Sequence, residues 1–475
     1  MLEGLEVKSI LYSKLIIDNE KFRFDDNFFL KKYLYAYDLI KKNTYVRFDS
    51  IIDVLTDFHA NGSYENIAKV FSLLDEKGYA YMVRTTDLEK KDYKNDVKYI
   101  SKECYDYLSK SRLYGEELLI NKIGTPGKVY LMPKLNYPCS LGMNLFMVRL
   151  KKNCALNTHF LWAFFNTKIG KDIINRKING TVPLTIDKEA IRSLYIPLYS
   201  ETFQNIIAQI VKEAEHLTDY STKSYQQTEE VFANFINFKL PLNRNIYNIK
   251  AITQSYNLSG RLDAEYYQSK YDKLFAKLEG FETKRLGDIV HIDKSIEPGS
   301  EAYQNSGIPF IRVANLSKYG ITDTDIFISQ DDYADVIRPK RDTILLSKDG
   351  SVGIAYKVEQ DMNVITSGAI LHLTVTDKEF MPDYLTLVLN SVVVSMQAER
   401  DAGGSVIQHW KPSEIKDVII PKLSIEIQQE ITDKVRESFA LRKESMRLLE
   451  LAKTAVEVAI EQGETAAMEF ITANK

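Results

Sequence analysis

Cysteine and histidine are scarce in this chain of 475 residues. The three cysteines, Cys104, Cys139 and Cys154, form no Cys-x-x-Cys pair and leave one thiol over, which suits a reducing compartment. The six histidines lack metal-ligand spacing, so we expect no metal site. No run of 18 apolar residues is present, and the first residues lack the pattern of a signal peptide. We therefore expect a cytoplasmic protein.

Motifs of several enzyme classes are also missing. The 12 prolines include no Pro-Pro pair, so the (Asn/Asp)-Pro-Pro-aromatic loop of amino-methyltransferases cannot be present. The 21 glycines include no Gly-x-Gly, and no Walker A motif occurs. One nuclease-like pattern remains, in which Asp383 is followed by Glu414 and Lys416. Short motifs of this kind often arise by chance, and the equivalent stretch in the first half, 190–192, lacks the carboxylate.

The chain contains an internal repeat. Residues 166–197 match residues 390–421 at a constant offset of 224, which aligns Gly180 with Gly404. Further upstream, 82–88 matches 310–316 at offset 228, and 23–25 matches 261–263 at offset 238. A repeat of this length predicts two similar modules on one polypeptide.

The drift of the offset from 238 to 228 places about ten extra residues in the first module, between Ile52 and Arg84. We expect the insertion at or after the turn-rich segment 57–63. Charge is also uneven. Residues 1–199 hold 31 Lys and Arg against 24 Asp and Glu, a balance of +7, whereas the remainder holds 31 against 41, a balance of −10. A locally basic surface can bind phosphates although the whole chain is acidic, but random scatter of surface charge explains the numbers equally well.

Hydrophobic periodicity predicts the same order of elements in both modules. Each opens with an amphipathic helix, continues with short strands, returns to a helix and closes on a strand, which is typical of an α+β fold. The expected helices are 28–40, 158–175, 266–278 and 382–399, and the expected strands are 79–84, 117–120, 144–150, 195–197, 309–313, 343–346, 369–375 and 418–421.

A long helix is predicted after each module. From Phe203 to Phe235, apolar or small residues recur with the 4-3-4-3 spacing of a coiled-coil seam, and Pro241 should end the helix. Residues 424–461 show a wider apolar stripe, which favours contact with more than one helix. At about 35 residues each helix would span roughly 50 Å. We expect the two to pair as an antiparallel coiled coil that sets the distance between the modules.

The chain resembles the DNA-specificity subunit of type I restriction–modification systems over nearly its whole length. No single motif is specific, but their order is repeated and each repeat precedes a long helix. Two departures, at 198–199 with 422–423 and at 203–205, bear on subfamily only. The stretches that carry the resemblance are 261–267, 286–289, 307–312, 345–353, 403–405, 415–421 and 428–431.

The resemblance implies a role for each segment of the chain. Each repeat would be a target-recognition domain that reads half of a bipartite site in double-stranded DNA. The long helices would dock two methyltransferase (modification) subunits, which carry S-adenosylmethionine, and a restriction/translocase subunit; this chain itself would have no cofactor and no catalytic residues. The expected segments are the domains 1–199 and 259–422, the helices 200–240 and 423–462, a linker at 241–258 and a C-terminal tail at 463–475.

Candidate DNA contacts lie in polar loops that recur in both modules. The loop 124–128 matches 350–353, and its glycines would let backbone amides approach phosphates, although a plain hairpin turn explains the same pattern. A second loop, 179–181, matches 403–405. The residues assigned to these loops and their flanks are Lys122, Thr125, Lys128, Arg176, Lys177, Thr181, Lys348, Ser351, Ser405, Gln408, His409 and Trp410.

Residues that differ between modules are better candidates for reading bases than residues that are shared. Arg84 and Arg312, the latter with Asn315, follow the same predicted strand in both copies, which favours a shared structural role. His59, Asn61 and Ser63 lie in the inserted segment and are candidates for specificity, unless the insertion has no function. Two other functions stay open: a stand-alone DNA-modifying enzyme, either a nuclease or a fused methyltransferase, and a specificity-like subunit of another phage-defence system.

Overall fold

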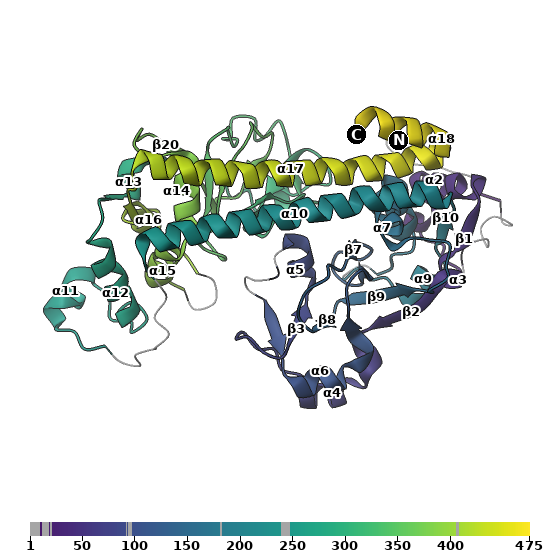
Figure 1. The fold of residues 1–475 in the computed structure, drawn as a ribbon, viewed down its shortest axis with the longest axis horizontal. Coiled ribbons are helices and arrows are strands. Elements are labelled where there is room, and N and C mark those ends of the chain that lie inside the picture. Colours follow the sequence, from purple (N-terminus) through teal and green to yellow (C-terminus); the bar gives the residue numbers. More distant parts are fainter. Residues whose placement is uncertain are drawn as a thin grey trace. The chain divides into compact units, whose positions relative to one another are not determined.

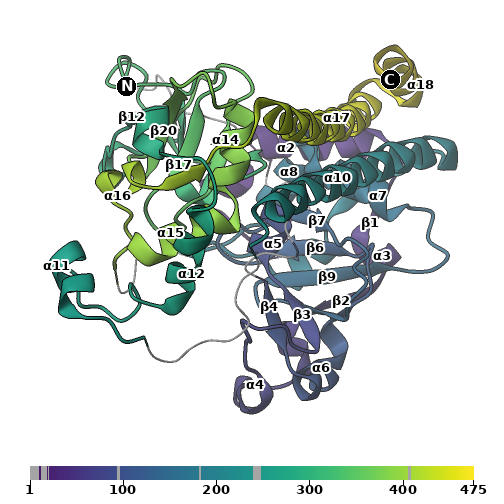
Figure 2. The same cartoon turned by 60° about the vertical axis from the view of Figure 1, so that its left-hand side comes forward.

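The computed structural model divides the chain into two compact units, each of which takes half of both long helices. The first unit comprises Met1–Leu217 and Glu444–Lys475, and the second Thr218–Lys443. The structure describes residues 10–11, 19, 21–91, 93, 97–180, 183–238, 248–404 and 408–475. Figures 1 and 2 show the elements of each unit in two views.

The first unit is built on two four-stranded sheets, with strand orders β2-β9-β6-β7 and β4-β3-β8-β5. A short pair, β1-β10, joins its opening and closing strands. The strands are β1 (Tyr45–Arg47), β2 (Ile52–Asp57), β3 (Ala80–Val83), β4 (Lys98–Ile100), β5 (Arg112–Leu113), β6 (Leu118–Asn121), β7 (Val129–Leu131), β8 (Cys139–Leu141), β9 (Leu145–Leu150) and β10 (Tyr195–Pro197). The helices are η1 (Asp26–Phe29), α2 (Lys31–Lys42), α3 (Phe48–Ile51), η2 (Phe58–Asn61), α4 (Tyr64–Val70), α5 (Thr85–Lys90), α6 (Lys102–Tyr107), η3 (Ser109–Ser111), α7 (Thr158–Asn166), α8 (Lys168–Asn175) and α9 (Lys188–Arg192).

The second unit repeats the main sheet in the same order, as β12-β20-β17-β18. A three-stranded sheet, β16-β13-β19, and the pairs β14-β15 and β11-β21 complete it. The strands are β11 (Thr283–Arg285), β12 (Val290–Lys294), β13 (Ile308–Ile311), β14 (Leu316–Ser317), β15 (Gly320–Ile321), β16 (Phe327–Ile328), β17 (Ile344–Ser347), β18 (Ala355–Lys357), β19 (Ile365–Thr366), β20 (Ile370–Val375) and β21 (Ile419–Pro421). The helices are η4 (Ile252–Gln254), α11 (Tyr256–Ser259), α12 (Ser269–Leu278), α13 (Leu286–Ile289), η5 (Ser300–Ala302), η6 (Val313–Asn315), α14 (Pro382–Leu389), α15 (Val392–Asp401) and α16 (Pro412–Lys416).

The central strands β6 and β17 each begin with three apolar residues because both of their faces are covered. Successive side chains of a strand point to opposite faces. In β6, Leu118 and Ile120 accordingly join the core under α7 and α8, whereas Leu119 joins the core of the second sheet. In β17, Ile344 and Leu346 lie in one core and Leu345 in another. The repeated apolar run therefore specifies a buried strand in both units.

The helix predicted at 158–175 is two helices, and so is the one predicted at 382–399. The N–H of Gly170 donates to Oγ1 of Thr167, which caps α8 and starts a new helix direction. A Cβ at Gly170 would lie 2.0 Å from the carbonyl oxygen of Phe164, so the turn also requires glycine. In the second unit α14 and α15 are separated at 390–391. The apolar pattern continues through both breaks, which is why periodicity missed them.

The long helices are α10 (Glu201–Ile236) and α17 (Ile425–Gln462), and they pair antiparallel in both units. Small side chains occupy the contact. In the second unit Oγ of Ser438 donates to the carbonyl oxygen of Ser221 (2.7 Å), and in the first unit Oγ of Ser445 donates to that of Ala214 (2.6 Å). The antiparallel coiled coil expected from the spacing is confirmed.

Two details of α10 differ from the prediction. The buried stripe passes through Tyr225, Phe232 and Ile236, whereas Phe235 is 42% exposed. A helix with 3.6 residues per turn drifts away from a strict 3.5-residue spacing, so the predicted seam loses phase toward its end. The helix ends at Ile236, and Pro241 lies outside the described residues.

The segment 463–475 is a helix rather than a tail. It forms α18 (Glu464–Asn474), whose Ala467 and Ile471 are buried in the core of the first unit. The carboxylate of Glu464 accepts from the N–H of Ser200, immediately before α10. The segment expected as a linker, 241–258, is described only from residue 248 and contains η4 and part of α11.

Candidate nucleic-acid interface

One edge of the main sheet in each unit gathers the turns that sequence analysis singled out. In the first unit, Asp57 of β2 pairs with Phe146 of β9, and Leu145 pairs with Asn121 of β6. Because neighbouring strands are antiparallel, the end of β2, the start of β9, the end of β6 and the start of β7 lie along one edge. The second unit shows the same arrangement, with Ser347 of β17 opposite Ile370 of β20.

The two candidate loops of the first unit are hydrogen-bonded to each other at this edge. The N–H of Ile186 donates to the carbonyl oxygen of Lys122 (3.1 Å), and that of Gly124 to the carbonyl oxygen of Leu184 (3.4 Å). Asn179 and Thr185 exchange two backbone hydrogen bonds of 2.8 Å, which closes the second loop on itself. The loops 122–128 and 179–186 thus form one surface.

The second unit makes the same contacts at equivalent positions. The N–H of Trp410 donates to the carbonyl oxygen of Lys348 (2.8 Å), and that of Gly350 to the carbonyl oxygen of Gln408 (2.9 Å). Gly403 and His409 exchange two hydrogen bonds of 3.0 and 2.7 Å. We call the described residues of 122–128 with 179–186, and of 348–353 with 403–410, the paired-loop surface of each unit.

The first loop of each surface is a hairpin turn with the same backbone. Gly127 and Gly353 have a φ of +86°, and their N–H groups donate to the carbonyl oxygens of Asn121 (2.8 Å) and Ser347 (2.9 Å). A left-handed φ of this kind favours glycine. The hairpin interpretation is therefore correct for the backbone. Any contact with a ligand depends on the side chains that the turn exposes.

The three lysines expected to supply charge are each held in an ion pair. Lys122 is 8% exposed, and its Nζ lies 3.1 Å from Asp57. Lys128 pairs with Glu89 at 3.2 Å, and Lys348 pairs with Asp349. A phosphate would have to replace the carboxylate in each case.

Asp57 also binds Lys188 at the start of α9, with Nζ 2.7 Å away, so that two lysines share one carboxylate. Burial by itself raises the pKa of Asp57, but the hydrogen bonds from Lys188 and Lys122 outweigh it and hold the pKa below its ordinary value. The edge of the first unit therefore keeps a net positive cluster.

Three further candidates are core residues. Arg176 is 3% exposed; its Nε donates to the carbonyl oxygen of Phe28, and its guanidinium lies between the rings of Phe28 and Tyr37. Lys177 is 5% exposed beside the same two rings. Trp410 is 1% exposed. These side chains support the loops from beneath and do not reach a ligand on the paired-loop surface.

Arg84 and Arg312 have the shared structural role that their repetition predicts. The N–H of Arg84 donates to Oδ2 of Asp87 (2.8 Å), and that of Arg312 to Oδ1 of Asn315 (3.1 Å), so the side chains of Asp87 and Asn315 cap the turn after each strand. The guanidinium of Arg84 also pairs with Asp87 at 2.7 Å. Asn315 replaces that carboxylate in the second unit, where the side chain of Arg312 is exposed.

The insertion of the first unit adds η2 and α4 after β2. Asn61 is engaged within the unit: its Nδ2 donates to Oγ of Ser111 (3.0 Å), and its Oδ1 accepts from the N–H of Lys110 (2.9 Å). Ser63 accepts from the N–H of Asn66 and caps α4. His59 is exposed. Ser63 is exposed as well, but its hydroxyl is engaged in the cap, so His59 is the better-placed candidate for contact with a ligand.

The exposed side chains of the second paired-loop surface are different. Ser351, Gln408 and His409 are exposed, and Nδ1 of His409 lies 2.8 Å from Oδ1 of Asp349. Burial raises the pKa of Asp349, but Lys348 and His409 outweigh it, and the net shift is downward. On the first surface the exposed side chains include Thr125 and Lys128. The frame is thus shared, and the side chains that it presents are not.

Four further residues of the two paired-loop segments remain to be placed. Thr181 and Ser405 lie outside the described residues. Leu184 and Thr185 belong to the paired-loop surface but were not singled out. The offset of 224 aligns them with Gln408 and His409, so the repeat contained the signal. Lys188 was missed because no pattern in the sequence connects it with Asp57.

The carboxylates of the nuclease-like pattern are engaged within the second unit. Asp383 is 1% exposed, and its carboxylate lies 3.1 Å from Nζ of Lys357 and 3.0 Å from Nη2 of Arg436. Glu414 accepts from the N–H of Lys411 and caps α16. Within the part of the chain that the structure describes, no group of three or more His, Cys, Asp or Glu side chains could hold a metal ion. Both carboxylates therefore have structural partners instead.

No helix among the described residues is both long enough and apolar enough to cross a membrane.

Comparisons with known proteins agree with the repeat. A curated relative, the type I restriction enzyme MjaIX specificity subunit of Methanocaldococcus jannaschii, is 25% identical over 285 residues. The match covers 56% of this chain and 59% of that relative.

Two crystal structures also match. The S subunit of a type I restriction-modification system from M. genitalium is 14% identical with a TM-score of 0.35, over 89% of this chain and 95% of that chain. The HsdS subunit from Thermoanaerobacter tengcongensis is 14% identical with a TM-score of 0.28, over 88% and 97%.

The family model for the type I restriction modification DNA specificity domain matches the chain twice, at 63–230 and at 278–444. The second match contains the whole main sheet and the first contains all of it except β2; each contains a paired-loop surface and ends within a long helix. The two matches together span more than half of the chain, which therefore belongs to the type I restriction modification DNA specificity family.

Proposed function

We propose that the chain is the DNA-specificity subunit of a type I restriction–modification complex. Each unit reads one half of a bipartite, asymmetric site in double-stranded DNA. The observation that carries the proposal is the double match to the specificity family, which falls on two units with the same paired-loop frame. A shared frame with different exposed side chains suits two different half-sites.

In this proposal the frame positions the DNA and the variable side chains select its sequence. Backbone N–H groups and lysines of the hairpin turns contact phosphates, which carry little sequence information. Base contacts come from the exposed residues that differ between units. These are His59 and Thr125 in the first unit and Ser351, Gln408 and His409 in the second.

The partners are modification and restriction subunits of the same complex. The methyl-transfer chemistry, with S-adenosylmethionine, belongs to an adenine methyltransferase subunit. This chain lacks the (Asn/Asp)-Pro-Pro-aromatic motif of amino-methyltransferases and has no Gly-x-Gly. The long helices are the docking elements for two such subunits. Exposed positions along α10 and α17 leave room for further helices.

The test is to incubate the chain with plasmid DNA and labelled S-adenosylmethionine, with and without the methyltransferase subunit encoded beside it. We expect methyl transfer only with the partner, at one bipartite sequence that can be mapped from the positions of the modified adenines. Methyl transfer by the chain alone would instead identify a stand-alone enzyme. Co-purification without any sequence preference would remove the specificity role.

A further inference from the structure

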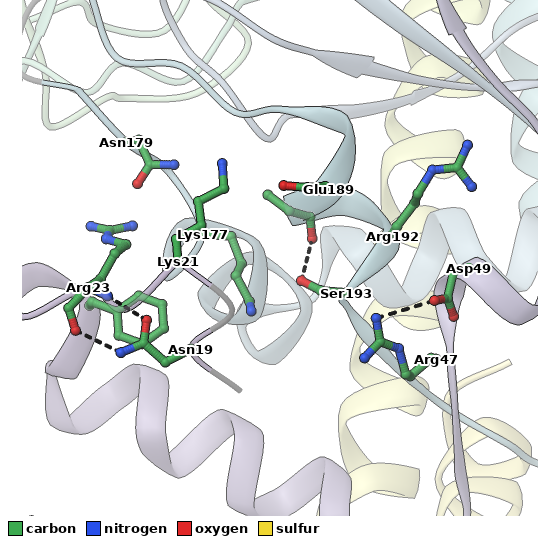
Figure 3. Close-up of a pocket in the computed structure, with 12 residues that line it drawn as sticks. Asn19, Lys21, Arg23, Arg47, Asp49, Lys177, Asn179, Glu189, Arg192 and Ser193 are labelled. Carbon is green, nitrogen blue, oxygen red and sulfur yellow. Dashed lines mark hydrogen bonds and ion pairs between the residues drawn. The ribbon is translucent and has the colours of Figure 1, made fainter. Parts of the chain in front are cut away.

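The first unit contains a basic cavity beside its paired-loop surface. The cavity has a volume of about 260 Å³ and is bounded by the segment before α2, the start of α3, the loop after α8 and the helix α9 (Figure 3). Five basic and two acidic side chains line it. They are Lys21, Arg23, Arg47, Lys177 and Arg192, and Asp49 and Glu189.

Several of these charges have partners within the unit. Arg47 pairs with Asp49 at 3.2 Å, and Lys21 pairs with Asp187. Arg23 is engaged by Asp25 and by two carbonyl groups. Arg192, at the end of α9, is half-buried and forms no ion pair or side-chain hydrogen bond among the described residues. The lining therefore retains a positive excess that its own carboxylates do not neutralise.

The same position in the second unit is not basic. The offsets of 238 and 224 align Arg23, Arg47 and Arg192 with Arg261, Arg285 and Lys416. Acidic side chains appear at three other positions, where Asp401, Glu414 and Asp417 replace Lys177, Ala190 and Ser193. With no counterpart charge at Lys21, Asp49 or Glu189, the second unit has three basic and three acidic residues here, against five and two in the first. Arg285 pairs with Asp417 at 3.2 Å.

The difference between the units indicates that the fold itself does not require a basic lining at this position. Both units make the same backbone contacts around this position, and the Arg23 and Arg261 side chains bind the equivalent loops in both. The fold is therefore compatible with a neutral lining. Asp25 and Asp187 offset the charges of Arg23 and Lys21, so the first-unit site keeps a net excess of one positive charge. An uncompensated positive charge in a concave site has an electrostatic cost that an anion would relieve.

The cavity is continuous with the paired-loop surface through two elements. Asn179 lines the cavity and also exchanges hydrogen bonds with Thr185 in the second loop. Helix α9 contributes Glu189 and Arg192 to the cavity, and its first residue, Lys188, binds Asp57 at the sheet edge. A DNA strand that crosses the paired-loop surface would reach the cavity.

We propose that this cavity is a phosphate-binding site of the first unit that has no counterpart in the second, and that its occupant is a backbone phosphate of bound DNA. This last assignment rests on the proposed function. Guanidinium groups are suited to phosphate because their planar donors match its oxygens. Arg192 is the main contact, with Arg47 beside it. The site anchors the first half-site by charge and does not read its bases.

Two matched variants of the full chain test the site. Arg192→Gln removes the main contact, and Lys416→Gln removes the equivalent charge in the second unit. DNA affinity is measured between about 50 and 200 mM salt on a duplex with the half-sites and on a scrambled duplex. For Arg192→Gln we expect weaker binding to both duplexes and a salt slope, log K against log [salt], smaller in magnitude by about one. Lys416→Gln should leave the slope unchanged. Arg192→Lys, which keeps the positive charge, should retain most of the wild-type slope.

A second measurement separates DNA from a small phosphate ligand. The melting temperature of each variant is followed as inorganic phosphate or pyrophosphate is added, with chloride at equal ionic strength as the control. Stabilisation of the wild type but not of Arg192→Gln, with equal DNA binding, assigns the site to a free phosphate compound. Equal salt slopes together with no phosphate effect overturn the proposal, as does an equal loss from Lys416→Gln. If the wild type binds no DNA at all, the proposed function fails while the phosphate titration still decides the cavity.

Discussion

The guanidinium of Arg261 donates a hydrogen bond of 3.0 Å to the carbonyl oxygen of Asp401 and so ties the segment after α11 to the end of α15, just before Gly403. The same side chain pairs with Asp263, with Nε 2.9 Å from Oδ1. In the first unit Arg23 repeats both contacts, with Asp25 and with the carbonyl oxygen of Ile178 at 2.7 Å. The Arg-x-Asp motif is therefore a clamp on the second loop of each paired-loop surface.

Replacing this arginine by lysine should loosen the loop. Lysine cannot bind a carboxylate and a carbonyl group at once with a planar fork. For Arg261→Lys we expect the free energy of unfolding of the second unit to fall by about 1–2 kcal/mol, the scale of hydrogen bonds to a partly exposed charged group. Urea denaturation of the full chain measures the change.

Arg285→Lys is the matched control for this variant. The side chains of Arg285 and Asp417 are 66% and 67% exposed, and such a pair contributes little. Its loss should change stability by no more than about 0.5 kcal/mol. Equal effects of the two variants would contradict the clamp.

The clamp illustrates how far the repeat could be interpreted from sequence alone. Offsets of 238 and 224 align Arg23 with Arg261 and Gly180 with Gly404, and the aligned residues occupy equivalent places in the two units. Alignment thus predicted which segments share a role. It could not show what the role is, because the contact joins residues 155 positions apart in one unit and 140 in the other.

The sequence did not reveal which charged side chains are buried or held in ion pairs. Arg176 and Lys177 look like surface residues beside a polar loop, yet Phe28 and Tyr37 cover them. The long aliphatic parts of such side chains pack well against aromatic rings. Lys122 meets Asp57 across 65 residues. Local spacing contains no information about partners at that distance.

The small residues of the helix pair should tolerate no enlargement. Ser438 is 1% exposed and donates to the carbonyl oxygen of Ser221, so the two backbones lie close together. Ser438→Leu would insert a large side chain into this contact and should lower the free energy of unfolding by about 1–3 kcal/mol or more. Glu437→Leu adds the same side chain at an exposed neighbouring position. A comparable loss from both variants, measured by thermal unfolding, would show that the close contact is not what matters.

The length of the helix pair should set the spacing of the two half-sites. The contacts Ser221–Ser438 and Ala214–Ser445 define an antiparallel register in which residues 218–224 face 435–441. Deleting these two seven-residue segments, 218–224 and 435–441, shortens the helix pair by about 10 Å, which is close to three base pairs of DNA. We expect the complex with its methyltransferase subunit to modify sites with a spacer shorter by about three base pairs.

The bases of the two half-sites should not change in this variant, because the paired-loop surfaces are untouched. Mapping of modified adenines across a genome reports both quantities at once. A variant with unchanged spacer length, or with altered half-sites, would exclude a role of the helices as a spacer. Deletion of the heptad from α10 alone is the control, since it breaks the register and should abolish modification instead of shifting it.

The buried histidine of the second unit should make its stability depend on pH. His372 of β20 is 4% exposed, and its Nε2 lies 2.8 Å from Oγ1 of Thr366. Burial lowers the pKa of His372 to about 4, against a weaker opposing effect of Asp293, its partner across the strands. In the unfolded chain the ordinary pKa is about 6.5. Between these values the unfolded state binds the extra proton, so acid favours unfolding.

Stability from this residue is therefore complete above pH 6.5 and is lost as the pH falls toward 4. A shift of this size corresponds to roughly 3 kcal/mol at the acid limit. The equivalent position in β9 is Met147, which pairs with Leu119 as His372 pairs with Leu345. His372→Met should therefore fit the strand and flatten the dependence of the unfolding free energy on pH between 6.5 and 4. Urea denaturation at several pH values tests this, and a His372→Met variant with the wild-type slope would assign the pH dependence to other groups.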